Sequence, residues 1–330
     1  MRAAFVPEPN RVEVGTFPDP VAQRPGELVV EMTRASICGS DVHSVYHGFH
    51  NPDGLGRPGY PGHEGVGVVI DSRSEDYPVG TRVLTVPVGN IGGCFAERQL
   101  LSDTQVVPIP DDADDAAILM AQQYGTTLFA MRLFWPETGN TGMTTRTCAI
   151  IGAGSAGLFF LQQALRLGFE RVIVSDLNAD RLAVAARLGA ETVHAPEASL
   201  AEAVLAATDG VGADLVIEAA GYDRCRADTI AAVRMFGTVG FFGFPEVDGD
   251  APFPMFDAFR KAARIQWASG TQGEPGLVSF RDAVRDIHEG RIDVSYCLGR
   301  EFSLEEMPRA MEVARDQGHG DVKLTICFDR

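Results

Sequence analysis

The chain has 330 residues, which is too many for one ordinary hydrophobic core and predicts two domains. Hydrophobic residues make up 45% and charged residues 22%, a composition that excludes a disordered protein. The net charge of -17 repels nucleic-acid phosphates and anionic membranes, so it favours a small-molecule ligand. The six cysteines form no CxxC pair, and residues 1–13 contain no secretion signal, so we expect a cytoplasmic protein.

The first part of the chain, up to about Val107, is rich in glycine, proline and short valine-rich runs. Runs such as 27–31 and 65–70 predict short strands and therefore a β-rich domain. Near Asp111 the pattern changes, because acidic residues precede a stretch with apolar residues at helical spacing. This stretch, 116–134, is predicted to be a capped helix.

From residue 147 onward, apolar strands alternate with helices, which indicates an α/β fold with a parallel, doubly wound sheet. We expect strands at 148–151, 171–175, 213–218 and 237–242, with helices that begin at Ala156, Ala179 and Cys225. After about residue 265 the pattern is mixed again, with helices around 280–289 and 304–315. The last strand, 322–328, is expected to rejoin the first domain.

A glycine-rich motif, Gly152-Ala-Gly154-Ser155-Ala156-Gly157, follows a predicted strand and opens a helix, which is the context of a dinucleotide site. Gly152 permits a tight turn, Gly154 lets the backbone approach a pyrophosphate, and Gly157 lets the helix pack on the strand. The helix N-terminus at Ser155 and Ala156 faces the phosphates. Asp176 ends the next strand, where a carboxylate binds the ribose of NAD and repels the 2′-phosphate of NADP. The alternative is a turn that binds nothing, with Asp176 as a cap.

A second set of residues has metal-binding chemistry. Cys38 stands in Ile37-Cys-Gly-Ser-Asp-Val-His43, and His63 and Glu64 stand in Pro61-Gly-His-Glu-Gly65. Thiolate, imidazole and carboxylate are zinc ligands, and a catalytic zinc ion keeps three protein ligands and one open position. Taken one by one, such residues are also common in cores and on surfaces, so this alternative stays open.

These motifs and the chain length resemble the zinc-containing medium-chain dehydrogenase/reductase superfamily, the relatives of alcohol, sorbitol and threonine dehydrogenases. The resemblance implies a β-rich GroES-like catalytic domain at 1–121, a Rossmann NAD-binding domain at 122–265, and a return to the catalytic domain at 266–330. It also implies an enzyme that transfers a hydride between NAD and an alcohol or ketone.

The same resemblance implies roles for individual residues. Cys38 and His63 correspond to zinc ligands, Glu64 to a near or alternating ligand, and Asp41 to the carboxylate that orients His63. Ser40 and His43 correspond to a relay that passes the alcohol proton through the cofactor ribose to water. Lys323 falls where the family often has a basic residue near the cofactor phosphates, and a solvated lysine at a strand end is the alternative.

Two departures limit the resemblance. The family often inserts a lobe with four cysteines for a second, structural zinc ion, whereas this chain has only Cys94 in that region, so we expect one zinc per chain. The family's third ligand aligns with Gln122, a neutral amide. Counting ligand charges, the site has a net charge of about +1 with Gln122 and about zero with Glu64. We favour Cys38, His63 and Glu64 as ligands at rest, with Gln122 near the open position.

In the family, the stretch after the relay histidine lines the substrate pocket, so the resemblance implies that the substrate contacts residues 46–50 and the following 51–53. The rings, donors and acceptors of this stretch suit a polyol, sugar or aminocyclitol. An exposed loop is the alternative. A homodimer or homotetramer is expected from the apolar strand 239–244 and the following segment 251–255, because in the family such strands lie at the sheet edge and join two cofactor domains edge to edge. A zinc-free quinone or enoyl reductase of the same superfamily, and a nucleotide-binding protein without turnover, are the competing functions.

Overall fold

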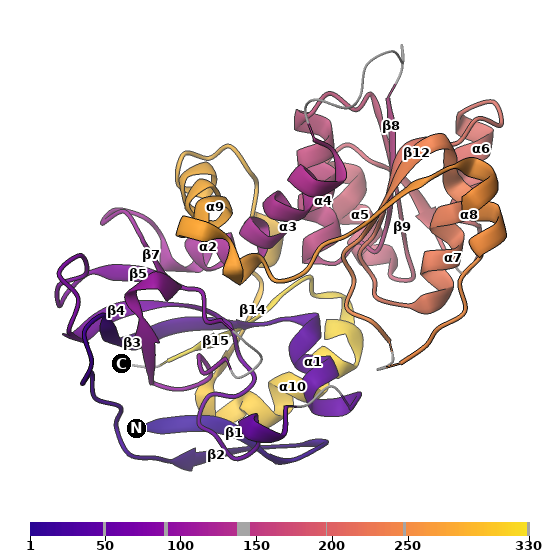
Figure 1. Cartoon of the computed structure of the whole chain (residues 1–330). Coiled ribbons are helices and arrows are strands. Elements are labelled where there is room, and N and C mark those ends of the chain that lie inside the picture. The colour runs from indigo at the N-terminus through magenta and orange to yellow at the C-terminus, as the bar shows by residue number, and fades with distance from the viewer. Residues whose placement is uncertain (49–50, 89–91, 137–145, 196, 247–248, 329–330) are drawn as a thin grey trace. The chain divides into compact units, whose positions relative to one another are not determined.

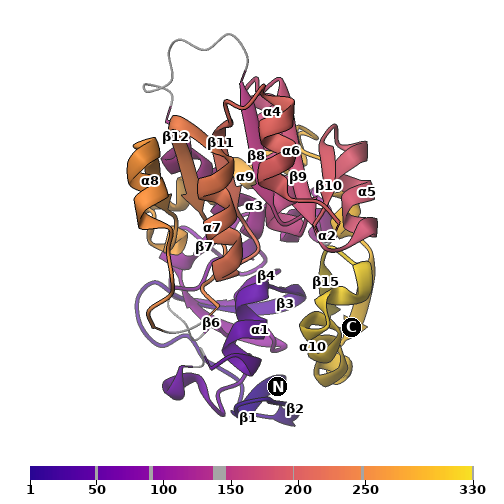
Figure 2. The same cartoon turned by 90° about the vertical axis from the view of Figure 1, so that its right-hand side faces the viewer.

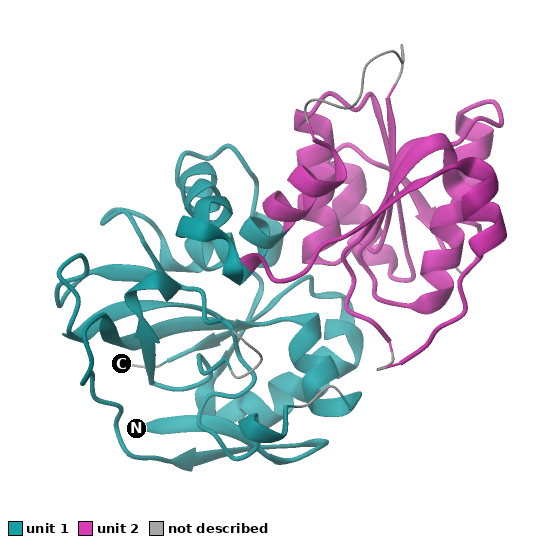
Figure 3. Ribbon diagram, viewed as in Figure 1, with its two compact units in different colours: residues 1–126, 272–330 teal, residues 127–271 magenta. Residues whose placement is uncertain are grey.

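The computed structural model describes residues 1–330 except 49–50, 89–91, 137–145, 196, 247–248 and 329–330 (Figure 1). The chain forms two compact units, which Figure 3 shows in different colours. Unit 1 comprises residues 1–126 and 272–330, and unit 2 comprises residues 127–271. Both fold classes expected from the sequence are confirmed, a sheet-rich unit and a parallel α/β unit. No helix in the described ranges is long and apolar enough to cross a membrane.

Unit 1 is built on a mostly antiparallel sheet that runs in the order β14-β15-β3-β4-β5-β7, with β6 also paired to β3. Its strands are β3 (Glu27–Ile37), β4 (Glu64–Ser72), β5 (Arg82–Thr85), β6 (Arg98–Ser102), β7 (Val106–Pro108), β14 (Arg300–Ser303) and β15 (Leu324–Cys327). A separate hairpin contains β1 (Arg2–Glu8) and β2 (Arg11–Thr16). The predicted return of the C-terminal strand is confirmed, because β15 pairs antiparallel with β3.

The helices of unit 1 include α1 (Gly39–Tyr46), α2 (Asp115–Leu119), α9 (Val278–His288) and α10 (Met307–Arg315), while α3 (Ala121–Phe134) continues into unit 2. The single helix expected at 116–134 is therefore two helices. The predicted acidic cap is present, since the Asp114 side chain accepts the N–H of Ala116. The break falls at Met120, whose N–H donates to Ala117 in the tighter pattern of a helix end.

Unit 2 contains a parallel sheet in the order β10-β9-β8-β11-β12-β13, seen from another side in Figure 2. The strands are β8 (Thr147–Ile151), β9 (Arg171–Asp176), β10 (Glu191–His194), β11 (Ala213–Glu218), β12 (Val233–Phe241) and β13 (Arg264–Trp267). The helices that connect them are α4 (Ser155–Arg166), α5 (Ala179–Arg187), α6 (Leu200–Ala207), α7 (Asp223–Ala232) and α8 (Met255–Lys261). The strand order reverses between β8 and β11, where such sheets bind ligands at the carboxyl ends of the strands.

The sequence did not predict β13, the strand at the end of the parallel sheet of unit 2. The stretch 239–244 was expected to lie at an exposed edge, but β12 pairs with β11 on one side and β13 on the other. Val239 and Phe241 are consequently buried. The expected edge position of 239–244 was wrong because the sequence analysis missed β13. This strand has only four residues, too few for an alternating pattern to be recognised.

Candidate active site

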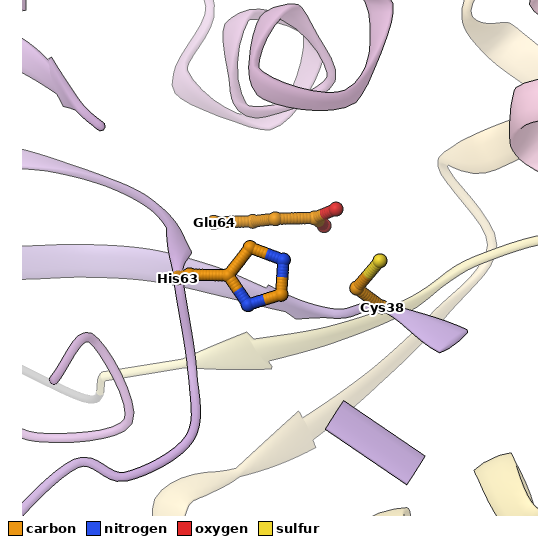
Figure 4. Close-up of side chains that lie close together, drawn as sticks. All are labelled: Cys38, His63 and Glu64. Atoms are coloured by element: carbon orange, nitrogen blue, oxygen red, sulfur yellow. The ribbon is translucent and has the colours of Figure 1, made fainter. Parts of the chain in front are cut away.

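Three side chains with metal-binding atoms lie close together in unit 1. Cys38 is the N-cap of α1 directly after β3, His63 precedes β4, and Glu64 is the first residue of β4. These segments are neighbours because β3 and β4 pair antiparallel, with Ser36 opposite Glu64. The Cys38 thiol, a His63 ring nitrogen and a Glu64 carboxylate oxygen lie within 4.8 Å of one another, directed to a common point (Figure 4).

Asp41 fixes the geometry of two members of this cluster. It is buried, and its Oδ1 lies 3.0 Å from Nδ1 of His63. Its Oδ2 accepts the backbone N–H of Cys38 at 2.8 Å. Burial alone lowers the pKa of the His63 imidazole, but the charges of Asp41 and Cys38 outweigh burial and raise it well above its ordinary value. Because Asp41 occupies Nδ1, the other ring nitrogen, Nε2, is the one that faces the cluster.

Glu64 has two further partners on its Oε2 oxygen. Nζ of Lys323 lies 2.5 Å away, and the Ser36 hydroxyl donates a hydrogen bond to the same oxygen. Burial raises the pKa of the Glu64 carboxyl, but Lys323 and His63 outweigh burial, so that the pKa lies below its ordinary value. Glu64 is therefore an ionised carboxylate held in place within the protein interior.

Lys323 lies in a different environment from the one expected. It is 4% exposed, so the alternative of a solvated lysine at a strand end is wrong. Its Nζ contacts Glu64 and, at 3.3 Å, Oε1 of Gln123. A role at the cofactor phosphates stays a prediction, which this burial does not favour. The sequence could not reveal the pair, because it depends on the pairing of β15 with β3 and of β3 with β4.

Gln122, the residue at the family's third ligand position, is the second residue of α3 and is 1% exposed. Its amide Nε2 has no hydrogen-bond partner in the described part of the chain. A buried amide without a partner is unusual and commonly marks a position where a ligand or water binds. The neighbouring Gln123 contacts Lys323, so the first turn of α3 lies beside the cluster.

The two predicted relay residues, Ser40 and His43, are both on α1. Ser40 Oγ lies 3.5 Å from Nε2 of His63, so its hydroxyl is next to the metal-binding cluster. Both relay side chains are half-buried, and the ring of His43 contacts the ring of His47. The structure thus places Ser40 between the cluster and the rest of α1.

The glycine-rich motif in unit 2 has the backbone shape that a dinucleotide requires. Gly152 has a φ of +102°, a conformation that favours glycine. A Cβ atom on Gly157 would lie 1.8 Å from the carbonyl oxygen of Gly152, so α4 packs directly on the turn. A Cβ atom on Gly154 would meet nothing within 4 Å, which leaves open space in front of the N-terminus of α4, where Ser155 and Ala156 begin the helix.

Asp176 lies at the carboxyl end of β9, beside this motif. Its Oδ2 accepts the N–H of Ala153 at 2.6 Å, and its Oδ1 accepts the N–H of Asn178 at 2.8 Å. The second bond is the turn-capping contact of the alternative interpretation, while Asn178 itself caps α5. Both interpretations of Asp176 are therefore compatible with its contacts.

Comparison with known proteins identifies the family. Residues 24–111 match the family "Alcohol dehydrogenase GroES-like domain", and residues 156–286 match the family "Zinc-binding dehydrogenase". The chain is 28% identical to a probable zinc-binding alcohol dehydrogenase of Mycobacterium tuberculosis, with coverage of 99% of this chain and 88% of the relative. The chain belongs to the zinc-containing medium-chain dehydrogenase/reductase superfamily.

Two further similarities concern substrate and cofactor. The chain is 25% identical to the sorbitol dehydrogenase of Bacillus subtilis, with coverage of 95% of this chain and 93% of the relative. A protein of Sinorhizobium meliloti described as a "putative zinc-binding dehydrogenase", solved with bound NADP, has the same fold, with a TM-score of 0.82, 23% identity and coverage of 99% of this chain and 98% of that chain. The predicted enzyme class, a zinc-dependent alcohol dehydrogenase, is confirmed.

Proposed function

We propose that this protein oxidises a polyhydroxylated secondary alcohol, or reduces the matching ketone, with one zinc ion per chain and NAD. The observation that carries the proposal is the cluster of Cys38, His63 and Glu64, whose three ligand atoms lie within 4.8 Å of one another. Sulfur, nitrogen and oxygen ligands in this number are those of a catalytic zinc site with one position open for substrate.

We assign Oε1 of Glu64 to the zinc ion, because the contacts of Lys323 and Ser36 both use Oε2. Nε2 of His63 is the corresponding nitrogen, because Nδ1 faces Asp41. Gln122 stays the alternative third ligand, and its buried amide without a partner supports a place near the open position.

Bound zinc would lower the pKa of an alcohol, and the nicotinamide would accept the hydride. The chain's own contribution is proton transfer. Ser40, beside Nε2 of His63, takes up the hydroxyl proton as it releases its own toward His43. Asp41 keeps the His63 ring in one orientation. The position of Nε2 in the cluster therefore stays fixed while the substrate alcohol loses its proton.

The cofactor site rests on unit 2. The open space at Gly154 admits a pyrophosphate against the N-terminus of α4, and the carboxylate of Asp176 favours the unmodified ribose of NAD. The substrate class rests on the polar stretch 46–50, of which residues 49–50 lie outside the described residues, and on the sorbitol dehydrogenase similarity.

Two measurements test this function. Metal analysis of the purified protein should give one zinc per chain, removable by a chelator with loss of activity. A panel of polyols and simple alcohols should show NAD reduction at the nicotinamide absorbance, fastest with a polyol. Full activity of a metal-free preparation would instead indicate a zinc-free reductase, and no turnover with any alcohol would contradict the function.

We also propose a homo-oligomer, formed through a different edge from the one first expected. In unit 2, β13 lies at the end of the sheet, and its Trp267 is 54% exposed. On the nearby α8, Phe256 and Phe259 are 72% and 77% exposed, which is unusual for large apolar side chains. Pairing with a second copy would cover this strand edge and these rings. A monomer at micromolar concentration by light scattering would contradict the proposal.

A further inference from the structure

One face of α1 carries three side chains that can transfer protons. Ser40, His43 and His47 are spaced by three and four residues, the spacing that places side chains on the same helix face. His47 is the C-cap residue, so this row extends along the whole helix, over about 10 Å. At its first end Ser40 lies 3.5 Å from Nε2 of His63. The row therefore connects the metal-binding cluster with the opposite end of α1.

The two histidines of the row are in contact. Their ring centroids are 4.8 Å apart, and the ring planes are inclined by 52°, so the two imidazole rings are close neighbours. Burial decreases along the row, because Ser40 and His43 are half-buried while His47 is exposed. A proton on His43 is thus partly shielded from solvent, whereas a proton on His47 can pass directly to a base in bulk water.

We propose that His47 is the outer proton carrier of the active site, and that it relays to solvent the proton that His43 receives. This proposal rests on the proposed function. During oxidation the C–H electron pair would leave as hydride to bound NAD, while the hydroxyl proton would enter the row at Ser40. His43 binds a proton at one ring nitrogen and releases one from the other. His47 accepts that proton, directly or through one water molecule, and gives it to a buffer base, so that one proton leaves per hydride transferred.

The surroundings of His47 suit a transient positive charge. It ends α1, and the C-terminus of a helix interacts favourably with a cation. The helix α10 packs against α1 and brings Glu312, Arg315 and Asp316 near Tyr46, the residue before His47. The Arg315 guanidinium lies 5.1 Å from the centroid of the Tyr46 ring. From the turn between β1 and β2, only the uncharged Asn10 bonds to α1 in the described residues, through the carbonyl of Val45.

The test compares His47→Gln with wild type in alcohol oxidation at pH 7 over a range of imidazole buffer concentrations. At the lowest concentration the variant should be slower by about tenfold, below the loss of about 10²–10⁴-fold expected when a general base itself is removed. Added imidazole should restore the rate, because a small diffusible base replaces the missing ring. His288→Gln is the matched control, since His288 is also an exposed histidine at a helix C-terminus. It should equal wild type at every buffer concentration.

A second readout does not require turnover. In the zinc-free, cofactor-free protein, the ring-proton NMR signal of His43 should titrate at higher pH in His47→Gln, because a neighbouring imidazolium no longer opposes its protonation. Two results would overturn the role of His47: a full oxidation rate of His47→Gln at the lowest buffer concentration, or a rate deficit that imidazole does not relieve. In both cases the alcohol oxidation by the wild-type protein would still support the proposed function. A wild-type protein that oxidises no alcohol would overturn both.

Discussion

The metal cluster of unit 1 and the glycine-rich turn of unit 2 are built in different ways. The cluster uses side chains from distant points of the sequence, Cys38, His63 and Glu64, and its support includes Lys323 near the C-terminus. The turn is one continuous segment, 152–157, that acts through its backbone and through the absence of Cβ atoms. One site therefore depends on charge and ligand chemistry, and the other on shape.

The largest expected effect tests the chemistry of the cluster. Cys38→Ala and His63→Ala each remove one ligand, so zinc binding should be lost and turnover should fall by about 10³-fold or more. Metal analysis and oxidation rate measure both effects. Cys225→Ala, at a half-buried cysteine of α7 in unit 2, should keep zinc and activity. Zinc retained in Cys38→Ala would exclude that thiol as a ligand.

The sequence predicted more of the glycine-rich turn than of the metal cluster and its supporting contacts. In the turn, whose strand, turn and helix are adjacent in the chain, Gly152 has the expected conformation and Gly157 the expected close packing. The role of Gly154 at a pyrophosphate stays a prediction. For the cluster, the sequence suggested Cys38, His63 and Glu64, and the structure brings them together.

The partners that hold Glu64 were not predictable. Its contact with Ser36 depends on the register of β3 against β4, and its contact with Lys323 on a strand that returns from the other end of the chain. Side-chain chemistry can be read from local motifs, but such strand registers are set by packing of the whole unit. The short edge strand β13 was missed for another reason, because four residues are too few for an alternating pattern to be recognised.

The second prediction concerns the ion pair that supports the cluster. Lys323→Met leaves the buried Glu64 carboxylate without its cation, and removing one partner of a buried pair costs about 3–5 kcal/mol of unfolding free energy. Denaturant unfolding of the zinc-free protein measures this loss. Adding Glu64→Gln to Lys323→Met should recover much of it, because no buried charge then remains. Equal stability of Lys323→Met and wild type would show that the pair is unimportant for folding.

The third prediction separates shape from chemistry within the turn. Gly157→Ala places a Cβ atom against the carbonyl oxygen of Gly152, so the turn or α4 must shift, at a cost of about 1–3 kcal/mol in unfolding free energy. Gly154→Ala meets nothing within 4 Å and should leave stability unchanged while it weakens NAD binding. Thermal unfolding and NAD titration, run on both variants, measure the two effects. A Gly154→Ala variant that binds NAD normally would place the pyrophosphate elsewhere.

The smallest effect is expected at Asp176, whose carboxylate places a negative charge beside the glycine-rich turn. This charge should make the protein prefer NAD over NADP. The carboxylate accepts two backbone N–H groups, from Ala153 and Asn178, which hold it at the carboxyl end of β9. A 2′-phosphate at the adenosine ribose would bring a second negative charge beside this carboxylate, so NADP should bind more weakly than NAD. The similar dehydrogenase solved with NADP does not decide the preference of this chain.

Asp176→Ser removes the charge and keeps a short hydrogen-bond acceptor. The ratio of kcat/KM for NAD to that for NADP should therefore fall by about 10- to 100-fold, equivalent to about 1.4–2.8 kcal/mol. Asp180→Ser, in the first turn of α5, is the matched control, since it removes one carboxylate from the same region and should leave the ratio unchanged. If wild type used NADP more efficiently than NAD, the contacts with Ala153 and Asn178 would define only the cap of a turn, and cofactor choice would lie with other residues.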